Sequence, residues 1–237
     1  MTKPTIGLGI LSWKSHETLL NTLQSFQKEN FLSLFDHAVI YFSDISEEDK
    51  KIAKDFSFEA KGGKNRGIAV GTEALARAVD ADYLLLLQND NPLIEPFSFA
   101  QEHLREALFL LEKKKVQLVR MRHQWLVGEG FSDVEKYLKY FPVRSRHPEF
   151  IPSEHSLEKA RYHDTAGKRI RRMFRPLKTH QMTGRSIYIE KHPEITFPRV
   201  IQKEGDFLII DSSVLVFSDQ CLLISKDFFL NVLMDYV

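Results

Sequence analysis

The stretch Tyr83-Leu84-Leu85-Leu86-Leu87-Gln88-Asn89-Asp90-Asn91-Pro92 ends a run of apolar residues in a polar cluster around one carboxylate. Such a run without alternation is typical of a strand covered on both faces, as in a parallel sheet between helices. Ligands of these sheets bind at the carboxyl ends of the strands. Asp90 is therefore expected where a metal or phosphate ligand lies, although a local Asx turn explains the same residue equally well at this point.

Strand patterns and amphipathic helix patterns alternate along the first half of the chain. This order predicts right-handed crossovers and an α/β fold with a mostly parallel sheet flanked by helices. The expected strands are Ile6 to Ser12, His37 to Phe42, Tyr83 to Leu87 and Val116 to Met121. Four helices are expected. The first follows Ser15 and extends to Phe26, and the others run from Ser46 through Phe56, from Ile68 through Val79, and from Phe97 to Leu111.

The regularity fades from about residue 123. Residues 142–184 are polar, basic and interrupted by prolines, which indicates a long irregular segment. Strands are expected at Ser186 to Glu190 and Phe207 to Phe217, and a final helix at Ser225 to Tyr236. We therefore expect one domain, 1–237, with a regular half at 1–122 and an irregular half at 123–237. It is either a whole protein or one domain of a longer one.

The composition is that of an ordinary globular protein. Of the 237 residues, 43% are hydrophobic and 27% charged, which favours neither disorder nor a fibrous class. No apolar run approaches the ~20 residues of a membrane span, and no secretion signal opens the chain. We expect a soluble, cytoplasmic protein. Cys221 is the only cysteine, and the apolar residues that follow it indicate a small buried residue rather than a nucleophile.

The net charge of +1 conceals an uneven distribution. Residues 111–200 hold 20 Lys or Arg against 10 Asp or Glu, a net +10, and the rest of the chain holds 13 against 22, a net −9. Such a basic region attracts phosphates, acidic acceptors or other polyanions. A solvated surface that balances the acidic part is the plain alternative.

Polar and aromatic residues follow three of the expected strands. They are Ser12-Trp13-Lys14, Ser43-Asp44 and Asn89-Asp90-Asn91, and the loop Gly63 to Gly67 lies between the second and third of them in the chain. Together they supply an aromatic ring, a carboxylate that accepts from a base N–H, cations for phosphates and an acid for a divalent ion. These are the requirements of a nucleoside diphosphate site.

In its first ~95 residues the chain resembles the nucleotide-binding half of GT-A glycosyltransferases, especially those of family 2. The resemblance rests on Ile10-Leu11-Ser12-Trp13-Lys14, on Asp44 after the second strand, and on Asn65-Arg66-Gly67 at the start of a helix. It implies that Ser12, Trp13 and Lys14 line the donor site and that Asp44 contacts the nucleobase. It also implies that Asn65, Arg66 and Asn89 contact base or phosphate.

The family's metal motif is D-x-D at the end of an apolar strand, and this chain has Asn89-Asp90-Asn91 there. The resemblance thus implies that Asp90 holds Mn²⁺ or Mg²⁺. One carboxylate is sufficient when substrate phosphates and waters complete the coordination of such hard ions. His180 is a second candidate ligand, and a surface or hydrogen-bonding histidine is its plain alternative.

The implied activity is transfer of a sugar, with inversion, from a nucleotide sugar, UDP-linked by preference, to a glycan or glycoprotein acceptor. Inversion requires a carboxylate as general base. Asp219 is the first candidate and Asp211 the second, although family 2 enzymes often place this residue beyond the equivalent of position 237. A basic segment with Lys168, Arg171, Arg172 and Arg175 is expected to close over the diphosphate, unless it is simply solvated.

Two other functions remain open from the sequence. One is a sugar nucleotidylyltransferase, although its glycine-rich first loop is missing. The other is a non-catalytic GT-A domain that binds glycan or polyanion through the basic region. Nucleic acid is not an expected partner. The absence of G-x-S-x-G, Walker and G-x-G-x-x-G motifs disfavours hydrolase, NTPase and dinucleotide-dependent functions.

Overall fold

A computed structural model describes residues 4–121, 130–132, 187–189, 194, 201–210 and 221–236. The chain divides into two compact units. The first combines Met1–His123 with Asp219–Val237, and the second is Gln124–Ser218. The assignment of 1–122 and 123–237 to two functional halves stays a prediction.

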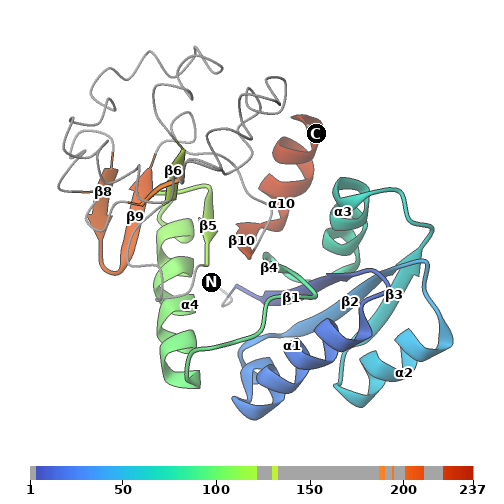
Figure 1. Cartoon of the computed structure of the whole chain (residues 1–237). Coiled ribbons are helices and arrows are strands. Elements are labelled where there is room, and N and C mark those ends of the chain that lie inside the picture. The colour runs from blue at the N-terminus through green and yellow to red at the C-terminus, as the bar shows by residue number, and fades with distance from the viewer. Residues whose placement is uncertain are drawn as a thin grey trace, which may run out of the picture. The chain divides into compact units, whose positions relative to one another are not determined.

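The first unit is built on a six-stranded sheet with the order β3-β2-β1-β4-β10-β5 (Figure 1). Neighbouring strands among β1 to β4 pair in parallel, and β10 pairs antiparallel to both β4 and β5. The strands are β1 Ile6–Ser12, β2 His37–Ser43, β3 Glu59–Gly63, β4 Tyr83–Gln88, β5 Leu118–Arg120 and β10 Leu222–Ser225. The predicted α/β class with a mostly parallel sheet is confirmed.

The register brings the carboxyl ends of the parallel strands to one edge. Leu11 lies opposite Gln88, Ser12 opposite Phe42, and Ser43 opposite Gly63. The chain leaves β1 for β2 and β3 on one side and returns to β4 on the other. The ends of β1 and β4 therefore flank a topological switch point, where open α/β sheets bind their ligands.

Helices cover both faces of the sheet. Helices α1 and α2 lie on one face and α3 on the other (Figure 1). Helix α2 begins with a complete capping box between Ser46 and Asp49, as its sequence predicts. The helical segments of this unit are α1 His16–Lys28, η1 Phe31–Leu34, α2 Glu47–Asp55, α3 Ile68–Ala78, α4 Phe97–Glu112, α10 Lys226–Phe228, η5 Phe229–Leu233 and η6 Met234–Tyr236.

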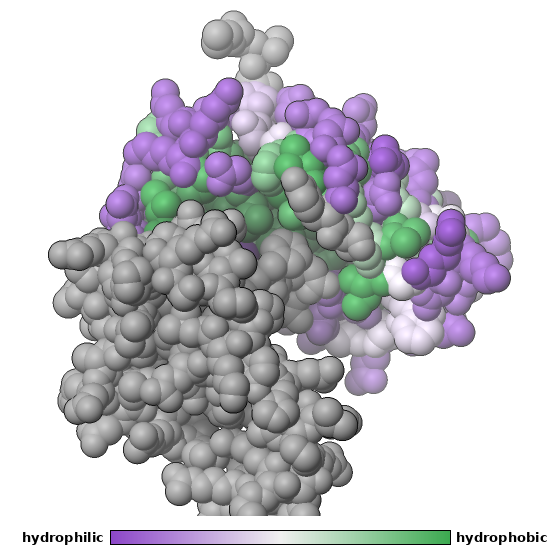
Figure 2. Space-filling model, turned by 90° about the horizontal axis from the view of Figure 1, so that it is seen from above, coloured by the Kyte–Doolittle hydropathy of each residue, from purple (hydrophilic) through white to green (hydrophobic). Residues whose placement is uncertain are grey.

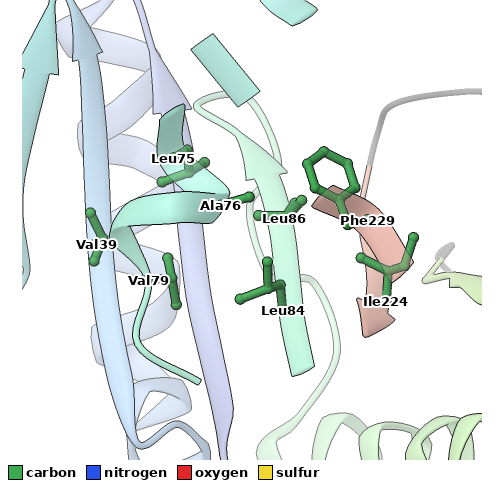
Figure 3. Packing of buried hydrophobic residues seen from close by; sticks show 8 residues of the cluster. All are labelled: Val39, Leu75, Ala76, Val79, Leu84, Leu86, Ile224 and Phe229. Atoms are coloured by element: carbon green, nitrogen blue, oxygen red, sulfur yellow. The ribbon is translucent and has the colours of Figure 1, made fainter. Parts of the chain in front are cut away.

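Apolar side chains from α3, the sheet and the C-terminal segment form one core cluster (Figure 3). Its buried members are Val39, Leu75, Ala76, Val79, Leu84, Leu86, Ile224 and Phe229. Two glycines of β1 let α3 approach the sheet. A Cβ atom on Gly7 would lie 2.1 Å from Cγ1 of Val79, and one on Gly9 would lie 3.0 Å from Cγ of Leu75. The space that a Cβ atom would need at Gly7 and Gly9 is therefore filled by the side chains of Val79 and Leu75. This close approach explains why glycine occurs inside the strand.

Two strands of the sheet were not predicted. Strand β3, Glu-Ala-Lys-Gly-Gly, lacks apolar alternation because it is an edge strand whose partner β2 lies on one side only. Strand β10, Leu-Leu-Ile-Ser, is a short apolar segment without the alternation of a half-buried strand. It fills the gap between β4 and β5 and brings the chain's C-terminal end into the first unit.

The C-terminal helix differs in type from its prediction. Residues 226–236 are helical, with Ser225 at the end of β10 as N-cap, but only Lys226–Phe228 is α-helix. Phe229–Leu233 follows as π-helix and Met234–Tyr236 as 3₁₀-helix.

The second unit contains two antiparallel pairs among its described residues. Strand β6, Gly130–Ser132, pairs with β7, Ile187–Ile189, which lies inside the predicted strand Ser186 to Glu190. Strand β8, Ile201–Glu204, pairs with β9, Phe207–Ile210, which begins where predicted. Residues 211–217 of that prediction lie outside the described residues. No helix in the described part of the chain is both long and apolar enough to cross a bilayer.

Candidate functional site

The loop after β1 presents an aromatic ring and a cation at the carboxyl edge of the sheet. Trp13 is 55% exposed, and Nζ of Lys14 lies 5.6 Å from the centroid of its ring. Lys14 has a φ of 49°, in the left-handed region that a lysine seldom adopts. Ser12, in contrast, is buried at 2% exposure, and its Oγ has no hydrogen-bond partner. This loop therefore offers an exposed aromatic surface beside a cation, while the Ser12 hydroxyl at the end of β1 has no partner among the described residues. The role of these residues in ligand binding stays a prediction.

The loop after β2 is fixed to the segment before α3. Asp44 has a φ of 62°, its N–H donates to the carbonyl of Gly63 at 2.7 Å, and its Oδ1 accepts from the N–H of Asn65 at 2.9 Å. Oδ1 of Asn65 in turn accepts from the N–H of Gly67 at 3.0 Å. The structure thus brings Asp44 and Asn65 together, and the second carboxylate oxygen of the exposed Asp44 remains available.

The amino end of α3 adds positive potential beside Asp44. Gly67 is its N-cap, with a φ of 93° and no side-chain cap, so among the described residues no N-cap side chain satisfies the first N–H groups of the helix. No acidic residue lies in the first turn, and Arg66 is exposed just before it. An exposed apolar residue, Ile68, opens the helix at 57% exposure. Figure 2 shows hydrophobic residues lying among hydrophilic ones on the described surface. The amino end of α3, with no acidic residue in its first turn, favours an anion such as phosphate.

The end of β4 presents one free carboxylate between two amides that point to backbone. Asp90 is exposed and makes no hydrogen bond or ion pair with a described residue. Nδ2 of Asn89 donates to the carbonyl of Ser15 at 3.4 Å, and Oδ1 of Asn91 accepts from the N–H of Gln88 at 2.9 Å. The N–H of Asn89 donates to the carbonyl of Leu11 at 3.1 Å. These contacts place the Asn89–Asn91 turn directly beside the β1 loop.

A contact that the sequence did not reveal joins the starts of α1 and α2. Nε2 of His16 lies 2.7 Å from Oδ1 of Asp49, whose other oxygen accepts from the N–H and the Oγ of Ser46 at 2.7 Å each. Nδ1 of His16 lies 3.6 Å from a carboxylate oxygen of Glu48. Burial raises the pKa of Asp49, but the hydrogen bonds from Ser46 and His16 outweigh it and lower the pKa below its ordinary value. The sequence predicts the capping box from local spacing, but it gives no indication that His16, 33 residues from Asp49, contacts it.

The predicted catalytic residues Asp219 and Asp211 and the second predicted metal ligand His180 lie outside the described residues. So do Lys168, Arg171, Arg172 and Arg175. Cys221 is described, and desolvation by burial raises the pKa of its thiol to about 12. The side chain is half-buried, and the thiol is protonated at neutral pH, which disfavours a nucleophilic role.

The donor set fits a hard divalent cation that the protein holds through one ligand. Asp90 offers a carboxylate free of competing partners, and Mg²⁺ in particular takes one or two protein carboxylates together with phosphate oxygens and waters. Within the described ranges, no group of three or more His, Cys, Asp and Glu residues is arranged to hold a metal ion. A metal at Asp90 would therefore depend on the phosphates of a bound nucleotide.

Comparison with solved structures gives partial matches to glycosyltransferases, the class that the sequence resembles. A mannosyltransferase from Pyrobaculum calidifontis, in complex with GDP-Man and Mn²⁺, matches 52% of this chain and 37% of its own at 10% identity and a TM-score of 0.41. Glucosyl-3-phosphoglycerate synthase from Mycobacterium tuberculosis, in complex with phosphoglyceric acid, matches 65% of this chain and 54% of its own at 13% identity and a TM-score of 0.43.

S. aureus TarS, residues 1–349 in complex with UDP, matches 53% of this chain and 40% of its own at 12% identity and a TM-score of 0.37. The chain thus spans about half or less of the length of these proteins. No protein-family model and no curated protein matches it.

Proposed function

We propose that this chain is a glycosyltransferase that uses Mn²⁺ or Mg²⁺ to transfer a sugar from a nucleotide sugar to a hydroxyl acceptor. One observation carries the proposal. An exposed aromatic residue, a carboxylate held in the left-handed region and an unpaired carboxylate follow three parallel strands at one switch-point edge. These are Trp13, Asp44 and Asp90.

The donor would occupy this edge with its base near β1 and β2 and its diphosphate near β4. The face of Trp13 suits packing against the base, and the free oxygen of Asp44 suits acceptance from a base N–H. Arg66 and the amino end of α3 would add positive potential for phosphate. We propose a UDP-sugar as donor because a uracil N–H is a fitting partner for Asp44.

Chemistry would depend on the charge that develops on the leaving nucleoside diphosphate. A metal held by Asp90 would act as Lewis acid on those phosphate oxygens. We propose that the reaction inverts the anomeric centre and that Asp219, with Asp211 as second candidate, accepts the proton of the acceptor hydroxyl. The acceptor would be a glycan or glycoprotein, for which the basic region 111–200 favours acidic groups.

The first test measures the melting temperature with UDP and other nucleoside diphosphates, with and without Mn²⁺. A ligand that binds only the folded state raises this temperature by mass action, so we expect a larger rise with Mn²⁺. Asp90→Ala should remove the Mn²⁺-dependent part and leave the protein folded, because Asp90 is exposed. Asp80→Ala is the matched control, since it removes an exposed carboxylate that precedes β4 at the opposite edge. No shift with any nucleotide would contradict the proposal.

The second test separates base binding from metal binding. Asp44→Ala should weaken nucleotide affinity roughly tenfold, the effect of losing a hydrogen bond to a charged group, and leave the Mn²⁺ dependence unchanged. Asp44→Asn is the control that keeps an acceptor for the N–H of Asn65 and so preserves the loop. Isothermal titration with UDP measures both. An unaltered affinity in Asp44→Ala would remove Asp44 from the base site.

The basic region supports one competing function, a non-catalytic domain that binds polyanions. Its mark would be steep salt dependence of heparin binding together with no nucleotide-dependent stabilisation. The same melting-temperature experiment therefore decides between the two functions.

A further inference from the structure

A polar stripe on α1 holds the segment that carries Asp90. Thr22, Ser25 and Glu29 follow one another at helical spacing, so they lie on one face of the helix. Each bonds to the backbone within residues 89–97, that is, to the segment 89–96 between β4 and α4, which has no regular secondary structure, or to the first residue of α4. We call this contact the α1 strap. It supplies backbone partners that the segment lacks.

The strap contacts the chain at Asn89, directly before Asp90, and at Leu93, three residues after it. Oγ1 of Thr22 donates to the carbonyl of Asn89 at 2.8 Å, and Oγ of Ser25 accepts from the N–H of Leu93 at 2.8 Å. Ser25 in turn donates to the carbonyl of Thr22 at 2.6 Å, so the two contacts are linked. Glu29 accepts from the N–H of Phe97 at 3.2 Å, at the start of α4.

Thr22 is the central member of the strap because it is fully buried. Its exposure is 0%, and a buried threonine in a helix ordinarily satisfies its hydroxyl at a carbonyl of its own helix. Thr72 of α3, which is only half-buried, donates in this way to the carbonyl of Ile68 at 2.9 Å. Thr22 instead reaches across to another segment, so its hydroxyl stabilises the tertiary position of Asn89.

The amides of Asn89 and Asn91 contribute to the same arrangement. They bond to the backbone at Ser15 and Gln88 and leave Asp90 as the exposed acid of the turn. Because one carboxylate alone would hold the metal, its position depends on backbone fixation rather than on a neighbouring ligand. We therefore propose, on the basis of the proposed function, that Thr22 is a positioning residue that fixes Asp90 for the divalent metal of the nucleotide complex.

The test replaces the Thr22 hydroxyl with a methyl group of similar shape. Thr22→Val should raise the Mn²⁺ concentration for half-maximal stabilisation of the UDP complex roughly tenfold, as loss of an outer partner of a metal ligand does. UDP binding without metal should stay unchanged. In the protein without ligands, amide hydrogen exchange in the peptide that covers residues 89–93 should become faster. Thr22→Ser, which keeps the hydroxyl, should have the Mn²⁺ midpoint and the exchange rate of the wild type. Thr72→Val is the matched control and should alter neither quantity.

The outcomes separate this inference from the proposed function. Nucleotide without any effect on the wild type would contradict the proposed function, and with it the metal role of Thr22. A wild type that responds to Mn²⁺ while Thr22→Val responds identically would overturn the positioning role alone, even if exchange became faster. If Thr22→Val does not fold, Ser25→Ala tests the strap at its second contact, since it removes the acceptor of the Leu93 N–H. It should shift the Mn²⁺ midpoint in the same direction. An unchanged midpoint in that variant would also overturn the proposal.

Discussion

Helices α1 and α3 cover opposite faces of the same sheet but contact the rest of the molecule in different ways. Helix α3 approaches the sheet closely over Gly7 and Gly9 and contributes Leu75 and Val79 to an apolar core (Figure 3). Helix α1 also buries apolar residues, yet it carries the polar strap to residues 89–97. The difference indicates that α3 mainly stabilises the fold, whereas α1 also positions the candidate site.

The largest expected effect lies under α3. Gly7→Ala places a Cβ atom 2.1 Å from Cγ1 of Val79 and 3.0 Å from Cβ of Ala81, so the helix must shift away from the sheet. We expect a loss of about 3 kcal/mol in the free energy of unfolding, the upper part of the range for overpacked cores. Urea denaturation measures this loss.

Gly9→Ala sharpens the same test at the next inward position. Its Cβ atom would meet the side chain of Leu75 at 3.0 to 3.1 Å, which a small rotation relieves, so we expect a loss of about 1 kcal/mol. A loss for Gly7→Ala no greater than for Gly9→Ala would show that close packing of α3 does not dominate stability.

An effect smaller than that of Gly7→Ala is expected where α1 contacts α2. Asp49→Asn removes the charged acceptor of His16 and Ser46 and should cost about 2 kcal/mol near pH 7, as hydrogen bonds to charged groups do. Because folding lowers the pKa of Asp49 below its ordinary value of 3.8, its stabilisation is complete above that pH. It is lost as pH falls through the lower value of the folded state.

The difference in unfolding free energy between wild type and Asp49→Asn should therefore shrink as pH falls below 3.8. Urea denaturation at a series of acidic pH values measures it. A difference that stays constant or grows below pH 3.8 would mean that Asp49 is not held as a stabilised carboxylate. Ser46→Ala is the companion variant, since it removes one donor and leaves the His16 contact.

The sequence predicted those parts of the fold whose pattern is local. The apolar run of β4, the alternation in β1 and the capping box of α2 each indicated their element and the sheet edge where it ends. Placing Trp13, Asp44 and Asp90 at that edge needed only the rule that parallel strands end together. The sequence therefore predicted that these three residues follow neighbouring strand ends, and their roles in binding stay predictions.

The remaining features depend on contacts between distant residues. Strand β10 forms because it pairs with both β4 and β5, and the short polar β3 forms because it pairs with the free edge of β2. The α1 strap joins residues 67 and 68 positions apart, and Thr22 and Ser25 look like ordinary helix residues until their partners are known. Residue patterns report local structure, so tertiary hydrogen bonds of this kind leave no trace in them.

The smallest expected effect is on the outer face of α3. Nη2 and Nε of Arg77 lie 2.7 and 3.0 Å from Oε1 of Glu73, in an ion pair between residues one helical turn apart. Because Arg77 is 60% exposed, water and salt screen the pair. Glu73→Gln should cost only about 0.3 kcal/mol, and 1 M NaCl should abolish the difference in urea denaturation. A loss above about 1 kcal/mol would place part of the stabilising role of α3 on its solvent face. The contrast with α1 would then no longer rest on the glycine-lined contact alone.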